Sequence, residues 1–151
     1  MNEAPLILIV EDDPDDVVLV RRAFLRLALP LHLVVLNDGL AAIRYLSGTD
    51  EFADRIAHPL PRFVLLDLKL PGLSGHEVLA WLRQRPDIGL LPVVVLTSSA
   101  QGPDIERAYS LGANSYLVKP VAFDDLIALI GAVAPYWGWH NEPPSNYRTA
   151  W

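Results

Sequence analysis

The sequence contains no cysteine, which excludes disulfide bonds, a thiolate nucleophile and cysteine-based zinc sites. Basic residues are also few, because 12 lysines and arginines face 18 aspartates and glutamates, for a formal net charge of −6. This balance argues against nucleic-acid binding, which normally requires a basic face. The four histidines are scattered without metal-ligand spacing; they are His32, His58, His76 and His140.

Long apolar runs are missing as well, since no stretch of this sequence reaches the roughly 18 residues of a membrane helix. The first apolar run is short and ends in carboxylates, unlike the hydrophobic region of a signal peptide. We therefore expect a cytoplasmic protein that does not enter a membrane. Hydrophobic residues make up 52% of the 151 positions, which suits the core of one domain.

Five short apolar runs are typical of strands buried in a parallel sheet. They cover residues 6–10, 31–36, 62–66, 91–97 and 115–118. Segments with helical spacing of apolar residues follow at 14–28, at 40–46, after the "PGLSG" loop (71–75), from 103 to the glycine at 112, and at 122–134. Strands that alternate with helices predict an α/β fold with a doubly wound, five-stranded parallel sheet. The polar segment 47–61 predicts a loop with one helical turn at 50–56.

Chemically active side chains follow four of these strands. Glu11 and Asp12 follow the first strand, Asp67 follows the third, Thr97 ends the fourth and Lys119 follows the fifth. Each alone has an ordinary explanation as a helix cap or a surface residue, but a doubly wound sheet binds its ligands at this edge. Close carboxylates repel one another unless a cation joins them, and oxygen ligands favour Mg²⁺. A carboxylate beside Mg²⁺ can accept a phosphoryl group, so the pattern predicts Asp67 as the nucleophile.

Four motifs resemble the receiver domain of bacterial two-component response regulators. They are "ILIVEDDPDD" (7–16), "VLLDLKLPGLSGHEVL" (64–79), "VVVLTSSA" (93–100) and "GANSYLVKP" (112–120). The resemblance implies a flavodoxin-like receiver fold with strand order 2-1-3-4-5 and a receiver domain at 1–134. It also implies that Asp67 accepts a phosphoryl group from a sensor histidine kinase. The protein would assist its own phosphotransfer and dephosphorylation, without being an enzyme toward other substrates.

The same resemblance assigns a metal site and a switch. Mg²⁺ would be held by Glu11, Asp12, Asp67 and the backbone carbonyl of Lys69. A second set of residues would bind the phosphoryl group and respond to it: Thr97 as the switch hydroxyl, Tyr116 as the moving aromatic ring, Lys119 as the cation, and Pro120 after a cis peptide bond.

More narrowly, the chain is similar to the small stand-alone regulators that partner bacterial phytochromes. The similarity lies in the long 47–61 segment, in "GANSYLVKPV" (112–121) and in the aromatic tail at 135–151. That tail is too short for an ordinary DNA-binding output domain, so we expect signalling through protein contacts, or a role as a phosphate sink or relay.

The tail places five aromatic residues in the last 16 positions, beginning with Tyr136, Trp137 and Trp139. Tryptophan and tyrosine are enriched at interface hot spots, so these three residues predict a homodimer interface. The alternative is a tail that folds back over its own domain.

Two other functions are compatible with parts of the pattern. Phosphatases of the haloacid dehalogenase type also place a nucleophilic Asp after a strand and require Mg²⁺. They carry a second Asp two residues later as the general acid, where this chain has Lys69. A receiver-like module that takes up no phosphate is disfavoured by the presence of Asp12, Asp67, Thr97 and Lys119.

Overall fold

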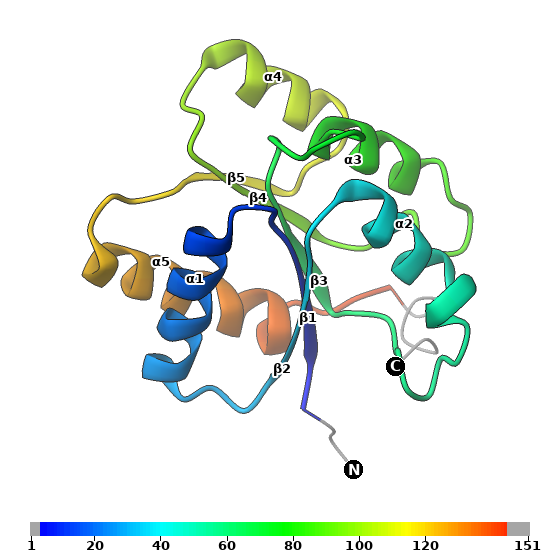
Figure 1. Cartoon of the computed structure of the whole chain (residues 1–151), viewed down its shortest axis with the longest axis horizontal. Coiled ribbons are helices and arrows are strands. Elements are labelled where there is room, and N and C mark those ends of the chain that lie inside the picture. The colour runs from blue at the N-terminus through cyan, green and yellow to red at the C-terminus, as the bar shows by residue number, and fades with distance from the viewer. Residues whose placement is uncertain (1–3, 145–151) are drawn as a thin grey trace.

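One parallel sheet of five strands forms the centre of the protein (Figure 1). The computed structural model describes residues 4–144. The strands are β1 (Leu6–Val10), β2 (His32–Leu36), β3 (Phe63–Leu66), β4 (Val93–Thr97) and β5 (Ser115–Val118). They lie in the order β2-β1-β3-β4-β5, and every neighbouring pair is parallel. The predicted doubly wound fold and its strand order are therefore confirmed.

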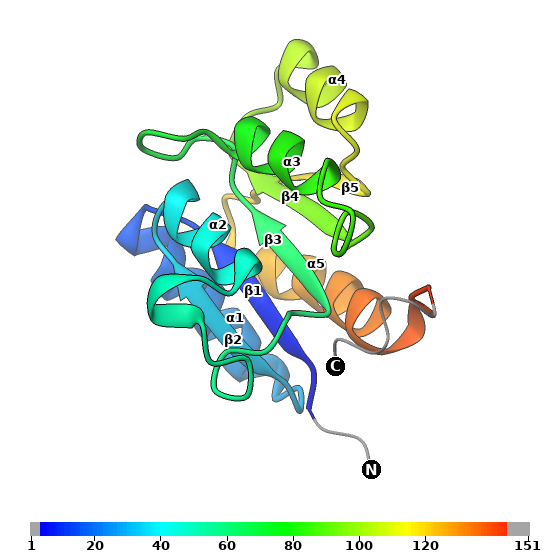
Figure 2. The same cartoon turned by 90° about the vertical axis from the view of Figure 1, so that its right-hand side faces the viewer.

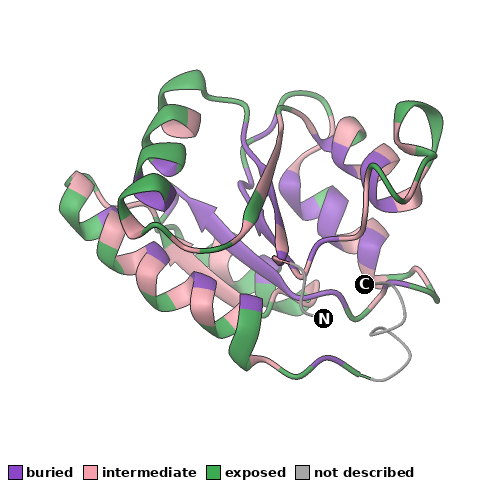
Figure 3. Cartoon of the chain, turned by 90° about the horizontal axis from the view of Figure 1, so that it is seen from below, coloured by how far each residue is buried: buried purple, intermediate pink, exposed green. Residues whose placement is uncertain are grey.

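The three central strands are buried because they consist almost wholly of apolar residues. All residues of β3 and β4 are buried, and in β1 only Leu6 is partly exposed. The edge strands β2 and β5 are less covered, and each begins with a polar residue, His32 or Ser115. In Figure 3 the buried centre of the sheet contrasts with the more exposed outer surfaces of the helices.

Helices cover both faces of the sheet (Figures 1 and 2). They are α1 (Pro14–Leu27), α2 (Gly39–Ser47), α3 (Gly75–Arg83), α4 (Gly102–Ser110) and α5 (Phe123–Pro135). One core, which includes Phe24 and Ile130, lies between the sheet and the pair α1 and α5. The other core, which includes Tyr45 and Leu79, lies under α2 and α3. Within residues 4–144, no helix combines the length and apolar character that crossing a bilayer requires.

The segment between α2 and β3 contains less helix than expected. A single 3₁₀ turn, η1 (Asp50–Phe52), replaces the predicted helical turn at 50–56. The rings of Phe52 and His58 pack on Tyr45, with centroids 5.0 and 6.0 Å from the tyrosine ring. The Tyr45 hydroxyl donates to the Pro59 carbonyl over 2.8 Å. Side-chain packing on α2, rather than helical hydrogen bonding, therefore orders this segment.

The helical end of the chain extends past the predicted boundary at 134. After α5 the chain continues as one turn of π-helix, η2 (Tyr136–His140). Trp137 packs against the core under α1 and α5, whereas Tyr136 and Trp139 stay 52% and 37% exposed. The remaining tail aromatics, Tyr147 and Trp151, lie outside the described residues.

Candidate functional site

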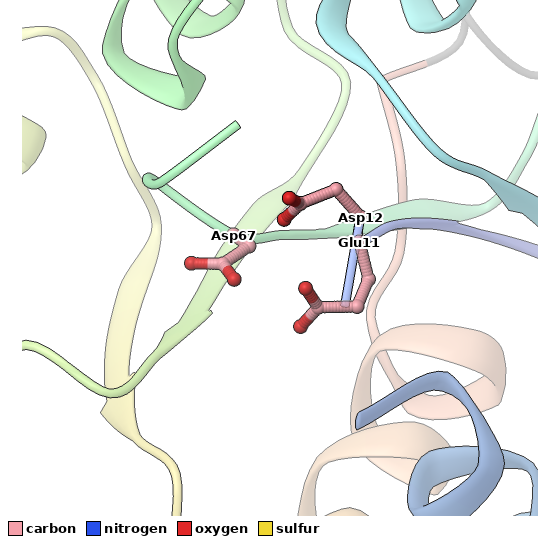
Figure 4. Close-up of side chains that lie close together, drawn as sticks. All are labelled: Glu11, Asp12 and Asp67. Carbon is pink, nitrogen blue, oxygen red and sulfur yellow. The ribbon is translucent and has the colours of Figure 1, made fainter. Parts of the chain in front are cut away.

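Three carboxylates meet at the carboxyl edge of the sheet (Figure 4). Glu11 and Asp12 follow β1, and Asp67 follows the adjacent strand β3. The Asp67 N–H donates to the Val10 carbonyl over 3.0 Å, so the strand ladder fixes the position of this aspartate. One carboxylate oxygen from each residue lies within 4.8 Å of the others. Such an all-oxygen set fits a hard divalent cation.

The three carboxylates differ in how far they are buried. Glu11 and Asp67 are buried, whereas Asp12 is exposed. Figure 4 shows the Glu11 and Asp12 side chains extending from the end of β1 toward Asp67. A cation at this edge would thus be reached from solvent past Asp12 and would lie against the buried Asp67.

Lys119 supplies positive charge to the same site. The Lys119 N–H donates to the Thr97 carbonyl over 2.8 Å, which fixes the residue at the end of β5. Its ammonium donates to Glu11 Oε1, to Asp16 Oδ2 over 2.8 Å and to Asp67 Oδ2 over 3.0 Å. The Lys119 side chain is only 13% exposed, so the surrounding water screens these ion pairs weakly.

The proton affinities of the site reflect this crowding of charge. Burial raises the pKa of Glu11 to about 7, and the Asp67 charge adds to the rise although Lys119 opposes it. Burial alone would also raise the pKa of Asp67, but the hydrogen bond and charge of Lys119 outweigh it and hold that pKa below its usual value. Burial would lower the pKa of Lys119, yet its hydrogen bonds to Asp16, Glu11 and Asp67 raise it. Asp67 therefore stays ionised at neutral pH, as a nucleophile requires.

A hydroxyl group without a well-formed hydrogen bond lies at the end of β4. Thr97 is completely buried, and its Oγ1 makes no hydrogen bond of ordinary geometry among residues 4–144, although it lies close enough to Asp67 to help lower the pKa of that carboxyl. Buried hydroxyls are nearly always hydrogen-bonded, so an orphan of this kind calls for an explanation. A ligand oxygen at the carboxyl edge of the sheet would provide the missing partner.

The loop after β3 brings its backbone close to Asp67. The Lys69 N–H donates to Asp67 Oδ1 over 3.2 Å, while the Lys69 side chain is exposed. Gly75 begins α3 so close to this loop that a Cβ there would lie 2.2 Å from the Asp67 carbonyl oxygen. Only glycine permits this approach. The general acid of the alternative phosphatase mechanism is thus replaced by a lysine that points to solvent.

Tyr116 lies on β5 and reaches the loop after β4. Its hydroxyl donates to the Ser99 carbonyl over 2.8 Å, and its ring packs beside a small buried cluster that includes Val95 and Ala108. The structure thus brings Glu11, Asp12, Asp67 and Lys119 into one cluster and places Thr97 and Tyr116 on the adjoining strands.

One predicted feature of the site is wrong. The bond between Lys119 and Pro120 is trans, and residues 4–144 contain no cis peptide bond. The trans isomer is the more stable form of an X–Pro bond by about 0.5–1 kcal/mol. Lys119 reaches its three carboxylates with this bond in the trans form, so the observed site geometry does not require the cis isomer.

Sequence reasoning did not find three further residues that the structure connects to Lys119 or to Tyr116. Asp16 contacts Lys119. Ser99 accepts from Tyr116 through its carbonyl and donates through its side chain to Asp104 Oδ2 over 2.5 Å at the start of α4. Asp16 comes four residues after Asp12, in the first turn of α1. An acidic residue at this spacing could have suggested a further carboxylate near the site. The Ser99–Asp104 contact depends on the loop conformation and had no comparable signal.

Comparison with known proteins agrees with this geometry. The family model for the response regulator receiver domain matches residues 7–131. The chain is 42% identical over 139 residues to the probable methanogenesis regulatory protein FilR2 of Methanothrix harundinacea, covering 91% of this chain and 87% of that protein. It is 38% identical over 136 residues to response regulator Rcp1 of Synechocystis, covering 90% of each chain.

Two solved structures share the fold. A Mn²⁺-bound form of Rcp1 has a TM-score of 0.82 at 36% identity and covers 93% of this chain and 99% of that one. The phosphorylated cyanobacterial phytochrome response regulator RcpA has a TM-score of 0.86 at 32% identity, covering 94% of this chain and 99% of that one.

Proposed function

The chain belongs to the response regulator receiver domain family, and on this basis we propose that Asp67 accepts a phosphoryl group from a sensor histidine kinase in a Mg²⁺-dependent reaction. The observation that carries the proposal is the Asp67 carboxylate, buried beside Glu11 and 3.0 Å from the Lys119 ammonium. A fixed, ionised carboxylate beside a cation is suited to phosphoryl transfer, which depends on positioning and charge stabilisation.

In the proposed reaction an Asp67 carboxylate oxygen attacks the phosphorus of a phosphohistidine. A phosphorus–oxygen bond forms while the phosphorus–nitrogen bond breaks, and the imidazole nitrogen leaves with the electron pair. Lys119 donates to the oxygens of the transferring group, and Thr97 gains the acceptor that its hydroxyl lacks. Donors placed before the reaction lower its barrier because they need not reorganise.

Glu11, Asp12 and Asp67 would hold the metal, together with the Lys69 carbonyl. A bound divalent ion would neutralise charge on the carboxylates and on the transferring oxygens. The carboxylate set favours Mg²⁺, and the Mn²⁺-bound form of Rcp1 is a solved relative with a divalent ion.

The same residues support assisted loss of the phosphoryl group rather than catalysis on other substrates. The exposed Lys69 stands where a phosphatase of the haloacid dehalogenase type needs an acid. We therefore favour a phosphoacceptor that assists its own phosphorylation and dephosphorylation. A phosphate sink or relay uses the same chemistry and differs only in the downstream partner.

We propose a phytochrome-type kinase as the donor, because receivers similar to this chain include a cyanobacterial phytochrome response regulator. The predicted cytoplasmic location, the 1–134 domain boundary and the separate tail at 135–151 remain predictions.

A homodimer also remains part of the proposal. The exposed rings of Tyr136 and Trp139 are available for a symmetric contact, whereas Trp137 already packs on its own core. The face would also include α4, β5 and α5; Tyr109 of α4, Val118 of β5 and Val121 between β5 and α5 are exposed. Exposed apolar and aromatic side chains are typical of protein interfaces when they form one patch.

Incubation with acetyl phosphate and Mg²⁺ tests the central proposal. Intact-mass analysis should show one added phosphoryl group on the wild type and none on Asp67→Asn, which keeps the shape but removes the nucleophilic charge. Uptake by Asp67→Asn at the wild-type rate would show that another residue is the acceptor. Omitting Mg²⁺ should slow uptake by the wild type.

A further inference from the structure

Lys119 has one carboxylate partner that lies outside the metal-binding cluster. Asp16 accepts a hydrogen bond from the Lys119 ammonium over 2.8 Å, whereas the other two partners, Glu11 and Asp67, belong to the cluster. An ammonium group has three N–H donors. Contacts with Glu11, Asp16 and Asp67 therefore occupy all the donors of Lys119.

A phosphoryl group on Asp67 would bring about two negative charges and new acceptor oxygens to this ammonium. To bind them, Lys119 must give up at least one present partner. Asp16 is the partner most easily released, because its side chain is 33% exposed, against 4% for Glu11 and 8% for Asp67. Water can replace the lost hydrogen bond at Asp16, whereas the buried Glu11 and Asp67 carboxylates would each need another partner, such as the metal ion.

Asp16 is also placed to act through Lys119 alone. Among residues 4–144, its side chain has no other hydrogen bond or ion pair. Its position in the first turn of α1 lets the helix dipole stabilise the carboxylate after Lys119 leaves.

We propose that Asp16 is a positioning residue that holds Lys119 in the unphosphorylated protein and competes with the phosphoryl group on Asp67 for it. This inference rests on the proposed function of Asp67. The charge on Asp16 then sets how readily the site accepts an anion, so removing that charge favours the anion-bound state.

The resting contact is tested first in the metal-free protein, without any phosphoryl transfer. A cycle of Asp16→Asn, Lys119→Met and the double variant is followed by urea unfolding. Asp16→Asn should raise the equilibrium constant of unfolding in both backgrounds. The increase should be about two- to fivefold larger with Lys119 than with methionine at this position, as for a partly exposed ion pair. Equal effects in both backgrounds would overturn the claim that Asp16 holds Lys119.

The competition is tested with trifluoroberyllate, an anion that mimics a phosphoryl group, titrated with Mg²⁺ and followed by ¹⁹F NMR. Asp16→Asn should lower the half-saturating concentration about two- to fivefold, the range of a partly exposed ion pair. Asp15→Asn is the matched control, because the exposed Asp15 has the same charge in the same helical turn and no contact with Lys119. The gain should disappear in the Lys119→Met background.

Three results would overturn the competition: equal binding by wild type and Asp16→Asn, an equal gain in Asp15→Asn, or a gain that persists without Lys119. A wild-type protein that takes up no trifluoroberyllate would instead overturn the proposed phosphoacceptor site, and the competition with it.

Discussion

The hydroxyl of Tyr116 donates a hydrogen bond to the Ser99 carbonyl over 2.8 Å, which joins β5 to the loop after β4. Ser99 in turn donates through its side chain to Asp104 in the first turn of α4 over 2.5 Å. His76 of α3 contacts the same turn of α4, with its Nε2 3.3 Å from the Asp104 carbonyl oxygen. Movement of this loop is therefore coupled to both β5 and α4.

Removing the Tyr116 hydroxyl should loosen this coupling. Tyr116→Phe keeps the ring but loses the bond to Ser99, so we expect faster amide exchange in residues 98–104 of the unphosphorylated protein. Phosphorylation of Asp67 should continue, while the difference in exchange between the two states becomes smaller. Tyr109→Phe is the control, since the Tyr109 hydroxyl accepts from the Tyr116 N–H over 3.1 Å and not from the loop after β4. Equal changes in both variants would contradict the assignment.

The orphan hydroxyl of Thr97 predicts opposite effects on stability and on response. Thr97→Val replaces a buried hydroxyl that makes no well-formed hydrogen bond by a methyl group of similar size. The free energy of unfolding should rise by about 1 kcal/mol, the lower range for an unsatisfied buried group. Phosphorylation should then produce a smaller change in amide exchange, because the switch hydroxyl is gone. Thr97→Ser keeps the hydroxyl and should retain the response; a Val variant that is less stable and fully responsive would refute this account.

Glu11 predicts how the metal-free protein responds to pH. Its pKa is raised from 4.5 to about 7 on folding, so the folded state binds more protons than the unfolded state between these values. The contribution of Glu11 to the free energy of unfolding should therefore increase as pH falls from about 7 toward 4.5 and be lost as pH rises through 7. Urea unfolding of wild type and Glu11→Gln across this range measures the difference. Metal affinity should change in the opposite sense, because the ion competes with the proton on Glu11. A pH-independent difference between the two proteins would contradict the prediction.

A side chain at position 75 should destabilise the fold, because Gly75 lies very close to the backbone of Asp67. In Gly75→Ala the new Cβ would meet the Asp67 carbonyl oxygen at 2.2 Å, so the backbone must shift. We expect a loss of about 1–3 kcal/mol in the free energy of unfolding, as for other overpacked sites. Gly102→Ala, in the first turn of α4, has no atom within 4 Å of its added Cβ and serves as the control. Equal stability of the two variants would show that the α3 loop relaxes freely.

The exposed aromatics of η2 test the dimer. Alanine at both Tyr136 and Trp139 should shift sedimentation at micromolar concentration from dimer toward monomer, because these side chains are 52% and 37% exposed. Trp137→Ala is expected to destabilise the fold instead, since Trp137 packs on the core. A wild-type protein that sediments as a monomer at this concentration would rule out the interface.

The sheet could be predicted from the sequence because its strands are short apolar runs that end in polar residues. The runs at 62–66 and 91–97 placed Asp67 and Thr97 correctly at strand ends, since parallel strands bring their carboxyl ends to one edge. The site residues could be placed together for the same reason. Their chemical roles follow from family membership and from the proposal, not from strand placement alone.

Contacts between side chains far apart in the sequence could not be predicted in the same way. The contact of Asp16 with Lys119 links residues 103 positions apart and depends on the long lysine side chain after β5 reaching the first turn of α1. The isomer of the Lys119–Pro120 bond was inferred from resemblance and proved wrong. The predicted helical turn at 50–56 was longer than the observed 3₁₀ turn at Asp50–Phe52. The aromatic contacts of Phe52 and His58 that order this segment are tertiary and leave no pattern in the local sequence.

The continuation of α5 into η2 has an electrostatic consequence. The 13 residues of α5 span about 20 Å, so the helix carries Tyr136 and Trp139 away from the carboxyl edge of the sheet that holds Asp67. At that end a Cβ on Gly138 would lie 3.8 Å from Pro5, next to the start of β1. Tyr136 and Trp139 carry no charge, so the field of a phosphoryl group on Asp67 has little to act on at these side chains, and it weakens further with distance along α5. Any influence of phosphorylation on a contact made there has to travel as a displacement of α5.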